Sequence, residues 1–350
     1  MTTTMLAGRL NLRTRAFAVE RVPVPAPGPG QVRIKVAAAG ICLSDVHLIE
    51  GSLTPLFNKE EKVTLGHEVS GTIDALGPGV PSFWKQGQRV LLQAGERCRV
   101  CVNCLREVAP CLQVRTRGVD YDGGWAEYAL ATHTTLVAIP DDLPFEQAAI
   151  IPDAVSTPWA AIVATGQARP AQSAGVWGVG GLGAHAVQLL RAIGAAPIVA
   201  IDPLEAARSR ALEFGADLAL DATAPDLRDR IKHITGGRGL DLAFDMAGVP
   251  AVREQALRCL GLGGRLVLVG LTPAALKLED SIAFSYRQQQ LVGHYGSEPE
   301  HVEQLVTLAR THRLDFSRSI SGKLSLADAA DGVERLRQKQ GNPIRLILTP

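Results

Sequence analysis

The chain places four of its six cysteines within one short run, CRVCVNCLREVAPC. These are Cys98, Cys101, Cys104 and Cys111. Thiolates separated by two-residue gaps can close a tetrahedral zinc site, and the free energy of metal binding then fixes the loop that carries them. Four thiolates leave no open coordination position, so we expect a structural zinc lobe over residues 95–113 that takes no part in the chemistry.

A second pair of possible zinc ligands is dispersed along the chain. Cys42 lies in GICLSDVH, residues 40–47, and His67 lies in GHE, residues 66–68. A thiolate and an imidazole are ligand types that suit zinc. Each also has a simpler interpretation, because free cysteines are common in protein cores and single histidines are more often structural residues.

The run GVWGVGGLG carries Gly178, Gly180 and Gly183 in the spacing G-x-G-x-x-G, with Gly181 between them. It lies between a predicted strand and a predicted helix, the context in which this motif binds the pyrophosphate of a dinucleotide at the helix N-terminus. The alternative is a glycine-rich turn that binds nothing. Strand, spacing and helix together favour the nucleotide.

An acidic residue follows at the distance that dinucleotide binding requires. Asp202 closes the strand PIVAID and would accept hydrogen bonds from the adenosine ribose hydroxyls. A 2'-phosphate would be repelled by this carboxylate, so the sequence predicts NAD as the cofactor rather than NADP. Arg208 and Arg210 lie close by in the sequence and leave this preference open.

The composition restricts the classes of protein that these motifs can belong to. The 350 residues are enough for two domains, and 36 Lys and Arg residues balance 35 Asp and Glu residues. This balance gives no sign of a nucleic-acid or membrane partner. The N-terminal sequence has no signal-peptide pattern, and no apolar run reaches the length of a membrane span, so we expect a cytoplasmic protein. Clustered cysteines in that reducing compartment are more often metal ligands than disulfides.

The elements that must position these residues change in character along the chain. Up to about residue 150, short β-like runs such as QVRIKVAAAG and VSGTIDALG alternate with Gly/Pro turns. From about residue 155, apolar strands alternate with helices, which predicts a doubly wound parallel sheet of the α/β class. One of these helices follows Gly183 and is expected to end at Gly194.

At this point the motifs resemble those of the zinc-dependent alcohol dehydrogenases of the medium-chain dehydrogenase/reductase superfamily. The resemblance rests on GICLSDVH, GHEVSG, the four-cysteine run, IIPDAVSTPW, GVGGLG and the final IRLILTP, and it spans nearly the whole chain. It implies a GroES-like, mainly β catalytic domain over 1–154, a Rossmann domain over 155–295, and a return to the catalytic domain over 296–350.

The resemblance also implies a second zinc site, giving two zinc ions per chain. Cys42, His67 and Asp153 would be the ligands of a catalytic zinc ion, although many relatives have cysteine at the third position. Asp45 would orient His67, and Glu68 would approach the metal when water leaves. Read without the resemblance, Asp153 is a helix N-cap before AVSTPWAA and Asp45 is another cap.

The resemblance assigns further residues to proton transfer and to the cofactor. Ser44 would take the alcohol proton and His47 would end a relay to solvent; without the family match they are a turn residue and a surface histidine. Thr157, Val269, Gly270 and Leu271 would contact the nicotinamide, and Arg345 the pyrophosphate. Trp84, Trp125 and Trp159 are candidate walls of the substrate pocket. His294 is a candidate substrate contact or a surface-loop residue.

These residues together predict an NAD-dependent alcohol dehydrogenase that oxidises a primary or secondary alcohol, including cyclic or aromatic ones, to an aldehyde or ketone. The resemblance implies a homotetramer or a homodimer. Two alternatives remain at this stage. One is a relative without catalytic zinc that reduces activated alkenes or quinones with NADPH, and the other is a zinc-ribbon protein without enzymatic activity. The net charge of the chain, close to zero, argues against a nucleic-acid-binding zinc ribbon. The reductase is less favoured because the chain retains Cys42, His67, Glu68 and Ser44.

Overall fold

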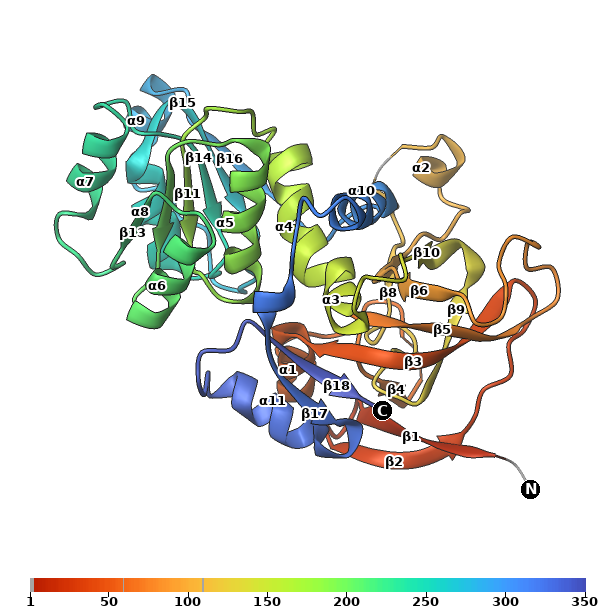
Figure 1. The fold of residues 1–350 in the computed structure, drawn as a ribbon. Coiled ribbons are helices and arrows are strands. Elements are labelled where there is room, and N and C mark those ends of the chain that lie inside the picture. Colours follow the sequence, from red (N-terminus) through yellow and green to blue (C-terminus); the bar gives the residue numbers. More distant parts are fainter. Residues whose placement is uncertain (1–2, 59, 109) are drawn as a thin grey trace. The chain divides into compact units, whose positions relative to one another are not determined.

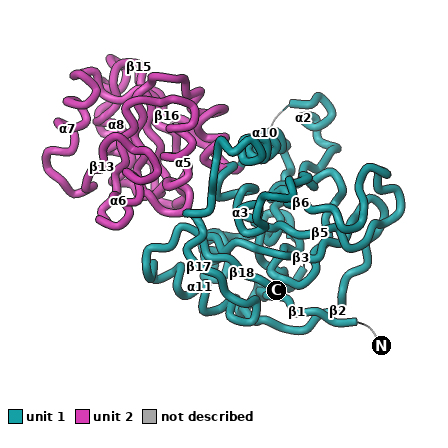
Figure 2. Tube along the Cα trace, in the orientation of Figure 1, with its two compact units in different colours: residues 1–156, 297–350 teal, residues 157–296 magenta. Residues whose placement is uncertain are grey.

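The computed structural model describes residues 3–58, 60–108 and 110–350. The chain divides into two compact units, Met1–Ser156 with Ser297–Pro350 as unit 1 and Thr157–Gly296 as unit 2 (Figure 2). The sequence-based boundaries lie at 154/155 and 295/296. Of the predicted zinc lobe, residue 109 lies outside the described part of the chain.

Unit 1 is built mainly from β-strands, as the short β-like runs of its sequence predict (Figure 1). Its largest sheet has the order β10-β6-β5-β3-β18-β17, with β9 also paired to β3. The strands of this sheet are β3 (Gln31–Ile41), β5 (Val69–Leu76), β6 (Arg89–Leu92), β9 (Tyr128–Thr132), β10 (Leu136–Ala138), β17 (Ile320–Ser325) and β18 (Arg345–Thr349). Two smaller sheets contain β1 (Thr4–Asn11), β2 (Phe17–Pro23) and β4 (Lys62–Thr64), and β7 (Gly95–Glu96) with β8 (Arg115–Thr116).

Strand β18 comes from the last residues of the chain and pairs antiparallel with β3, with Leu346 opposite Ile41. Strand β5 pairs antiparallel with the other edge of β3, with Val69 opposite Ala39. The end of β3 therefore lies beside the beginnings of β5 and β18. This register brings Cys42, Glu68 and Arg345 together although they are far apart in the sequence.

The helices of unit 1 are short. They are α1 (Leu43–Glu50), α2 (Val102–Leu105), α3 (Phe145–Ile150), α10 (Pro299–Arg310) and α11 (Ala329–Arg337), with single 3-10 turns η1 (His133–Thr135), η4 (Ser317–Ser319) and η5 (Leu326–Asp328). Helix α3 continues without a break into the π-helical η2 (Ile151–Val155) and then, past the end of unit 1 at Ser156, into α4 (Ser156–Ala160) and the π-helical η3 (Ala161–Thr165) of unit 2. The helical segment Phe145–Thr165 is long and apolar enough to cross a membrane, but 78% of its most apolar window is buried inside the protein, as in a core helix.

Unit 2 is the doubly wound parallel sheet that the alternating strands and helices predict. Its strand order is β13-β12-β11-β14-β15-β16, and all neighbouring pairs are parallel. The strands are β11 (Ala174–Trp177), β12 (Ile198–Ile201), β13 (Leu218–Leu220), β14 (Leu240–Asp245), β15 (Leu260–Leu268) and β16 (Gln290–Gly293). The helices are α5 (Gly181–Ile193), α6 (Glu205–Glu213), α7 (Leu227–Ile234), α8 (Pro250–Cys259) and α9 (Ser281–Tyr286).

The order of the strands in unit 2 reverses between β11 and β14. Ligands of such sheets bind beyond the carboxyl ends of the strands at this reversal. Helix α5 ends at Gly194, whose φ of 83° is the left-handed conformation that glycine adopts easily, as the sequence predicts. Figure 1 shows helices on both sides of the sheet.

Candidate metal centres and nucleotide site

Four possible metal ligands come together at the end of β3. We call Cys42, His67, Glu68 and Asp153 the Cys42 group; one ligand atom from each lies within 4.8 Å of all the others. Cys42 Sγ lies 3.4 Å and His67 Nε2 lies 3.3 Å from Asp153 Oδ2. Ligands of a tetrahedral zinc ion stand about 2.0–2.3 Å from the metal and so about 3.3–3.8 Å from one another. The observed separations of Cys42, His67 and Asp153 fit this geometry.

Asp153 lies inside the continuous helical segment, in the π-helical η2. The alternative interpretation of Asp153 as a helix N-cap is therefore wrong, because the helix begins at Phe145, eight residues earlier. Single turns of π-helix are rare and often occur at functional sites. The backbone N–H of Ala154 donates to Glu68 Oε1 at 3.1 Å, which ties the turn carrying Asp153 to a second member of the Cys42 group.

Asp45 is hydrogen-bonded to Cys42 and lies close to His67. Its Oδ2 accepts a hydrogen bond of 2.9 Å from the backbone N–H of Cys42, while its Oδ1 lies 3.8 Å from His67 Nδ1. His67 thus has Asp45 on one ring nitrogen and Asp153 on the other. Burial lowers the pKa of His67, but Asp45, Asp153 and Cys42 outweigh it and raise that pKa well above its ordinary value. Anionic groups on both sides of the imidazole favour a cation at this position, whether a proton or a metal ion.

Arg345 is wholly enclosed beside the Cys42 group, which the sequence did not indicate. It donates from Nε to Glu68 Oε1 at 3.1 Å, and its Nη2 lies 3.8 Å from Asp153 Oδ2 and 3.6 Å from Cys42 Sγ. These acidic neighbours raise the pKa of Arg345 against the opposing effect of burial. The predicted pyrophosphate contact remains a prediction; in this structure the guanidinium faces the metal-binding residues.

Glu68 fills a space that only glycine leaves open. A Cβ atom on Gly40 would lie 2.0 Å from Glu68 Oε2. This oxygen is buried and accepts no hydrogen bond from any described residue. Burial raises the pKa of Glu68 to about 7, although Arg345 opposes the shift. A buried carboxylate oxygen without a donor, close to three other possible ligands, is a position that suits a cation.

Ser44 and His47 follow Cys42 on helix α1. Ser44 Oγ is 3.7 Å from Cys42 Sγ, so the hydroxyl lies next to the Cys42 group. His47 is half-buried in the same helix, and the structure leaves its predicted part in a proton relay as a prediction. Trp125 is not a wall of a solvent-accessible pocket, because it is completely buried and donates from Nε1 to the Gly40 carbonyl at 2.9 Å.

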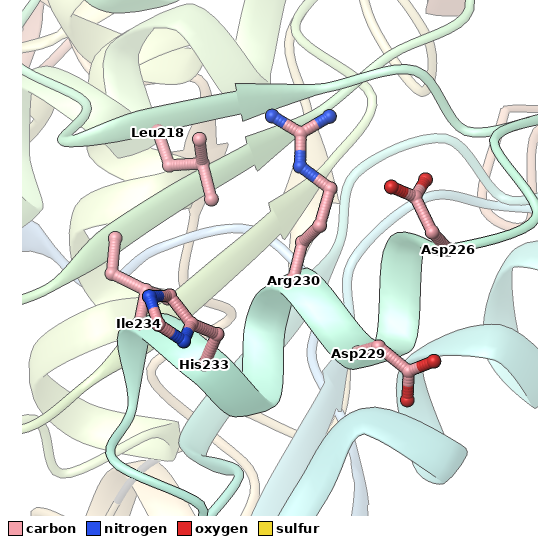
Figure 3. Close-up of a pocket in the computed structure, with 6 residues that line it drawn as sticks. All are labelled: Leu218, Asp226, Asp229, Arg230, His233 and Ile234. Carbon is pink, nitrogen blue, oxygen red and sulfur yellow. The ribbon is translucent and has the colours of Figure 1, made fainter.

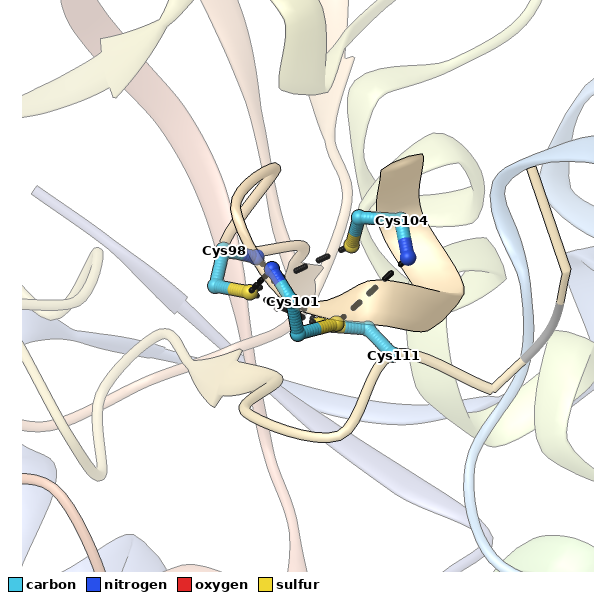
Figure 4. A group of neighbouring side chains, drawn as sticks. All are labelled: Cys98, Cys101, Cys104 and Cys111. Atoms are coloured by element: carbon cyan, nitrogen blue, oxygen red, sulfur yellow. Dashed lines mark hydrogen bonds between the residues drawn. The ribbon is translucent and has the colours of Figure 1, made fainter. Parts of the chain in front are cut away.

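The second group of ligands is the cysteine lobe, formed by Cys98, Cys101, Cys104 and Cys111 (Figure 4). Its sulfur atoms are separated by 3.5 Å for Cys98 and Cys111, 3.9 Å for Cys101 and Cys111, and 4.0 Å for Cys98 and Cys104. These values are close to the separation of about 3.8 Å expected for thiolates around tetrahedral zinc. All four cysteines are free thiols in the structure.

Backbone N–H groups in the lobe point at the sulfur atoms. Cys101 N donates to Cys98 Sγ at 3.3 Å, and Cys104 N donates to Cys101 Sγ at 3.4 Å. Backbone donors from Cys104 and Leu112 lower the pKa of Cys101 to about 6, whereas burial among the other sulfurs raises the pKa of Cys104 to about 12. The backbone donors thus favour the thiolate of Cys101, the form of cysteine that binds metal, whereas burial favours the neutral thiol of Cys104.

The glycines of GVWGVGGLG have the three structural roles that the motif predicts. Gly178 turns with φ of 86°, and a Cβ atom on Gly183 would lie 1.8 Å from the Gly178 carbonyl oxygen, so the helix packs closely on the turn. A Cβ atom on Gly180 would meet nothing within 4 Å. The turn therefore leaves open space next to Gly180 and the N-terminus of α5, where Gly181 begins the helix.

Asp202 follows β12 beside this turn. Its Oδ2 accepts from the backbone N–H of Val179 at 2.8 Å and its Oδ1 from that of Leu204 at 2.9 Å. Each oxygen keeps a second lone pair for a ribose hydroxyl. Arg208 donates to the Asp202 carbonyl at 2.9 Å and Arg210 to the Val179 carbonyl, so both arginines lie near the predicted adenosine site.

The residues predicted to contact nicotinamide lie in unit 2. The carbonyl oxygen of Thr157 is 3.0 Å from His294 Nε2, and His294 Nδ1 is 2.8 Å from Thr165 Oγ1. His294, directly after β16, is therefore linked to the helical segment of α4 and η3. Val269 is buried directly after β15, and Leu271 is 52% exposed.

A separate hollow of about 380 Å³ lies on α7 and the start of β13 (Figure 3). It is lined by Leu218, Asp226, Asp229, Arg230, His233 and Ile234. Leu218 is the first residue of its strand, whereas the glycine-rich turn and Asp202 follow the carboxyl ends of theirs. The hollow is therefore not part of the predicted nucleotide site.

Comparison with known proteins places these features in a family. Residues 28–141 match the alcohol dehydrogenase GroES-like domain, and residues 181–311 match the zinc-binding dehydrogenase domain. The sorbitol dehydrogenase of Bacillus subtilis (strain 168) is 30% identical over 348 residues, which cover 96% of this chain and 95% of that protein. The chain belongs to the zinc-type alcohol dehydrogenases of the medium-chain family. Unit 1 contains the matched GroES-like domain, and unit 2 contains the Rossmann-type parallel sheet.

Two other relatives of this alcohol dehydrogenase differ in their cofactors. The NAD-dependent alcohol dehydrogenase of Sulfurisphaera tokodaii is 30% identical over 339 residues, covering 95% of this chain and 96% of that protein. A crystal structure described as a zinc-binding dehydrogenase of Sinorhizobium meliloti 1021 is bound to NADP. It has a TM-score of 0.91 and 27% sequence identity, and the match covers 99% of this chain and all of that one.

Proposed function

We propose that this alcohol dehydrogenase oxidises a small primary or secondary alcohol to an aldehyde or ketone, with zinc in the Cys42 group and NAD as the hydride acceptor. One observation carries the proposal: Cys42, His67 and Asp153 converge at separations that suit tetrahedral zinc, with Ser44 beside them. Bound zinc would supply a Lewis acid that lowers the pKa of an alcohol hydroxyl.

The side chains around this position have separate tasks in the proposed reaction. Cys42, His67 and Asp153 would hold the metal, and Asp45, which accepts from the backbone N–H of Cys42, would orient His67. The Ser44 hydroxyl would accept the proton of the alcohol and His47 would pass it to solvent. Arg345 partly neutralises the negative charge of Glu68, Asp153 and Cys42, which limits the repulsion among them before metal binds.

In unit 2 the open space beside Gly180 and the N-terminus of α5 would bind the pyrophosphate. NAD supplies a nicotinamide ring that accepts the hydride. The Asp202 carboxylate supports NAD over NADP, because a 2'-phosphate next to it would be repelled. NADP is the second candidate, because Arg208 and Arg210 near Asp202 could pair with a 2'-phosphate. The NADP complex of the Sinorhizobium meliloti relative agrees with that alternative.

The experiment is an alcohol panel of primary, secondary, cyclic and aromatic members, assayed with NAD and with NADP at several pH values. We expect NAD(H)-linked turnover and about two zinc ions per chain. Ser44→Ala and His47→Gln should retain both metals while slowing oxidation near neutral pH by about tenfold or more. Asp141→Ala, an exposed site, is the control. Full turnover of Ser44→Ala, or NADPH-linked reduction of activated alkenes without alcohol oxidation, would contradict the proposal.

We also propose that the enzyme is a homotetramer or homodimer, as the family resemblance implies. Light scattering coupled to size-exclusion chromatography measures the mass of the assembly directly. A chain that elutes as a monomer of 37.2 kDa at assay concentrations would refute this assignment.

A further inference from the structure

We infer that Asp245 and Arg253 form a positioning pair that holds the turns on which the nicotinamide half of the dinucleotide rests. The inference depends on the proposed function, because it concerns how unit 2 binds its cofactor. Neither residue belongs to the glycine-rich motif, and their spacing in the sequence does not indicate a role. The inference rests on the contacts that they make in the structure.

Asp245 is the last residue of β14, the strand next to β11 at the reversal of strand order. Its Oδ1 accepts hydrogen bonds from the backbone N–H groups of Ala247 at 3.0 Å and Gly248 at 2.8 Å. Its carbonyl oxygen accepts from the N–H groups of Val269 at 3.0 Å and Gly270 at 2.8 Å. One residue thus fixes the turn after its own strand and the turn after β15.

Arg253 completes this arrangement from helix α8. Its Nε donates to Asp245 Oδ2 at 2.9 Å, and its Nη2 donates to the Gly270 carbonyl at 3.2 Å. The Asp245 side chain is fully buried and the Arg253 side chain is 9% exposed. A buried ion pair is weak support for stability in general, but a guanidinium that bonds a carboxylate and a carbonyl together sets their relative position.

The turns held by this pair are packed too closely to move separately. A Cβ atom on Gly270 would lie 2.2 Å from the Gly248 nitrogen, and one on Gly248 would lie 2.7 Å from the Leu271 carbonyl oxygen. The glycine-rich turn joins them, because a Cβ atom on Gly178 would lie 2.9 Å from Ala247 Cβ. The turns after β11, β14 and β15 therefore form one rigid edge.

We infer that this edge supports the nicotinamide half of the cofactor, whereas Asp202 lies at the adenosine half. In a doubly wound sheet a dinucleotide lies across the carboxyl ends of the strands on both sides of the reversal. Asp202 follows β12 on one side and marks the predicted adenosine half, so the turns after β14 and β15 belong to the nicotinamide half. A displacement of Gly270 would move the turn that supports the nicotinamide ring. A misplacement of about 1 Å between reacting groups can lower the rate about a hundredfold.

The test distinguishes the forked hydrogen bonding of the Arg253 guanidinium from its positive charge. Arg253→Lys retains a cation for Asp245, but a single ammonium lacks the fork that reaches Asp245 and the Gly270 carbonyl together. The matched control is Arg258→Lys on the same helix, where the arginine side chain is 63% exposed and pairs with Glu279. Binding of NADH, or of NADPH if the enzyme uses it, is measured by nicotinamide fluorescence on the zinc-loaded protein. Binding of ADP-ribose, which lacks the nicotinamide, is measured by calorimetry.

We expect Arg253→Lys to raise the Kd of the reduced cofactor about tenfold and to lower kcat by a similar factor, with the Kd of ADP-ribose changed by less than about twofold. Arg258→Lys should change none of the three. Equal losses of ADP-ribose and cofactor affinity, or no loss of either, would overturn the inference while the proposed function stands. A wild-type protein that binds neither reduced cofactor would overturn both. If Arg253→Lys does not fold, the neutral pair Asp245→Asn with Arg253→Gln gives the same comparison.

Discussion

In the cysteine lobe every sulfur comes from one short stretch of chain and three of the four side chains are partly exposed, whereas the Cys42 group joins distant residues and three of its four members are buried. Cys42 and Asp153 are 111 positions apart. The backbone N–H groups of the lobe point at its own sulfur atoms, but the Cys42 group depends on Arg345 from β18 as well as on the nearby Asp45 of α1. Local spacing is therefore enough to build the lobe, and the whole sheet is needed for the other site.

The largest effect should come from Asp153→Ala, which removes one proposed metal ligand from the Cys42 group. We expect the metal content to fall from about two zinc ions per chain to about one, and kcat to fall at least about a thousandfold, because the Lewis acid is lost. Elemental analysis and initial rates measure both quantities. Asp141→Ala is the control, and full zinc content with normal turnover in Asp153→Ala would show that Asp153 is no ligand.

The next effect concerns the buried charge. Arg345→Met leaves Glu68, Asp153 and Cys42 without their cation, and removing one partner of a buried ion pair costs about 3–5 kcal/mol. Urea unfolding of the metal-free protein gives the change in the free energy of unfolding. Arg337→Met breaks the exposed pair with Glu334 and should cost less than about 1 kcal/mol. Equal losses in both variants would mean that Arg345 does not compensate the Cys42 group.

A smaller and more local effect is expected in the cysteine lobe. Cys104→Ser should lose the zinc ion of the lobe and make proteolytic cleavage between residues 95 and 113 about tenfold faster, because the loop then has little else to hold it. Turnover should stay within about twofold of wild type if the two metal sites are independent. The control is Val102→Ser, an exposed neighbour on α2. A large fall in turnover with the second zinc still bound would refute the division between a structural and a catalytic site.

The smallest effect tests a link between the two regions. Arg97, in the lobe directly before Cys98, pairs with Glu298 at 2.8 Å, at the start of helix α10. Because both side chains are partly exposed, Arg97→Met should lower the free energy of unfolding by less than about 1 kcal/mol and leave turnover unchanged. The comparison is Arg99→Met, which changes a more exposed arginine of the same lobe. A clear loss of turnover in Arg97→Met alone would show that the lobe supports the Cys42 group through α10.

Much of this arrangement could be predicted from the sequence because it depends on local patterns. Alternating apolar strands and helices predict the parallel sheet of unit 2, and the spacing of Gly178, Gly180 and Gly183 predicts the turn before α5. The four cysteines of the lobe are visible in the same way. In the turn and the lobe the residues that contact one another are also close in the sequence, and in the sheet each strand and helix has a local pattern, although paired strands such as β11 and β14 lie far apart in the chain.

Other features follow from long-range packing and have no local signature. The sequence does not show that Arg345 faces Glu68, since that contact depends on the pairing of β18 with β3. Asp153 looks like a helix N-cap because its π-helical turn leaves no mark that periodicity detects. The pairing of Asp245 with Arg253 and Gly270 likewise depends on which turns meet at the edge of the folded sheet.

The register of β18 has a consequence for the synthesis of the protein on the ribosome. The cysteine lobe is complete once residue 111 has emerged, so it can take up metal while the rest of the chain is still being made. The Cys42 group lacks its compensating cation until Arg345 has been translated and β18 has joined β3. We therefore expect the lobe to reach its final arrangement during synthesis, and the Cys42 group to reach its own only after the last strand of the chain has paired.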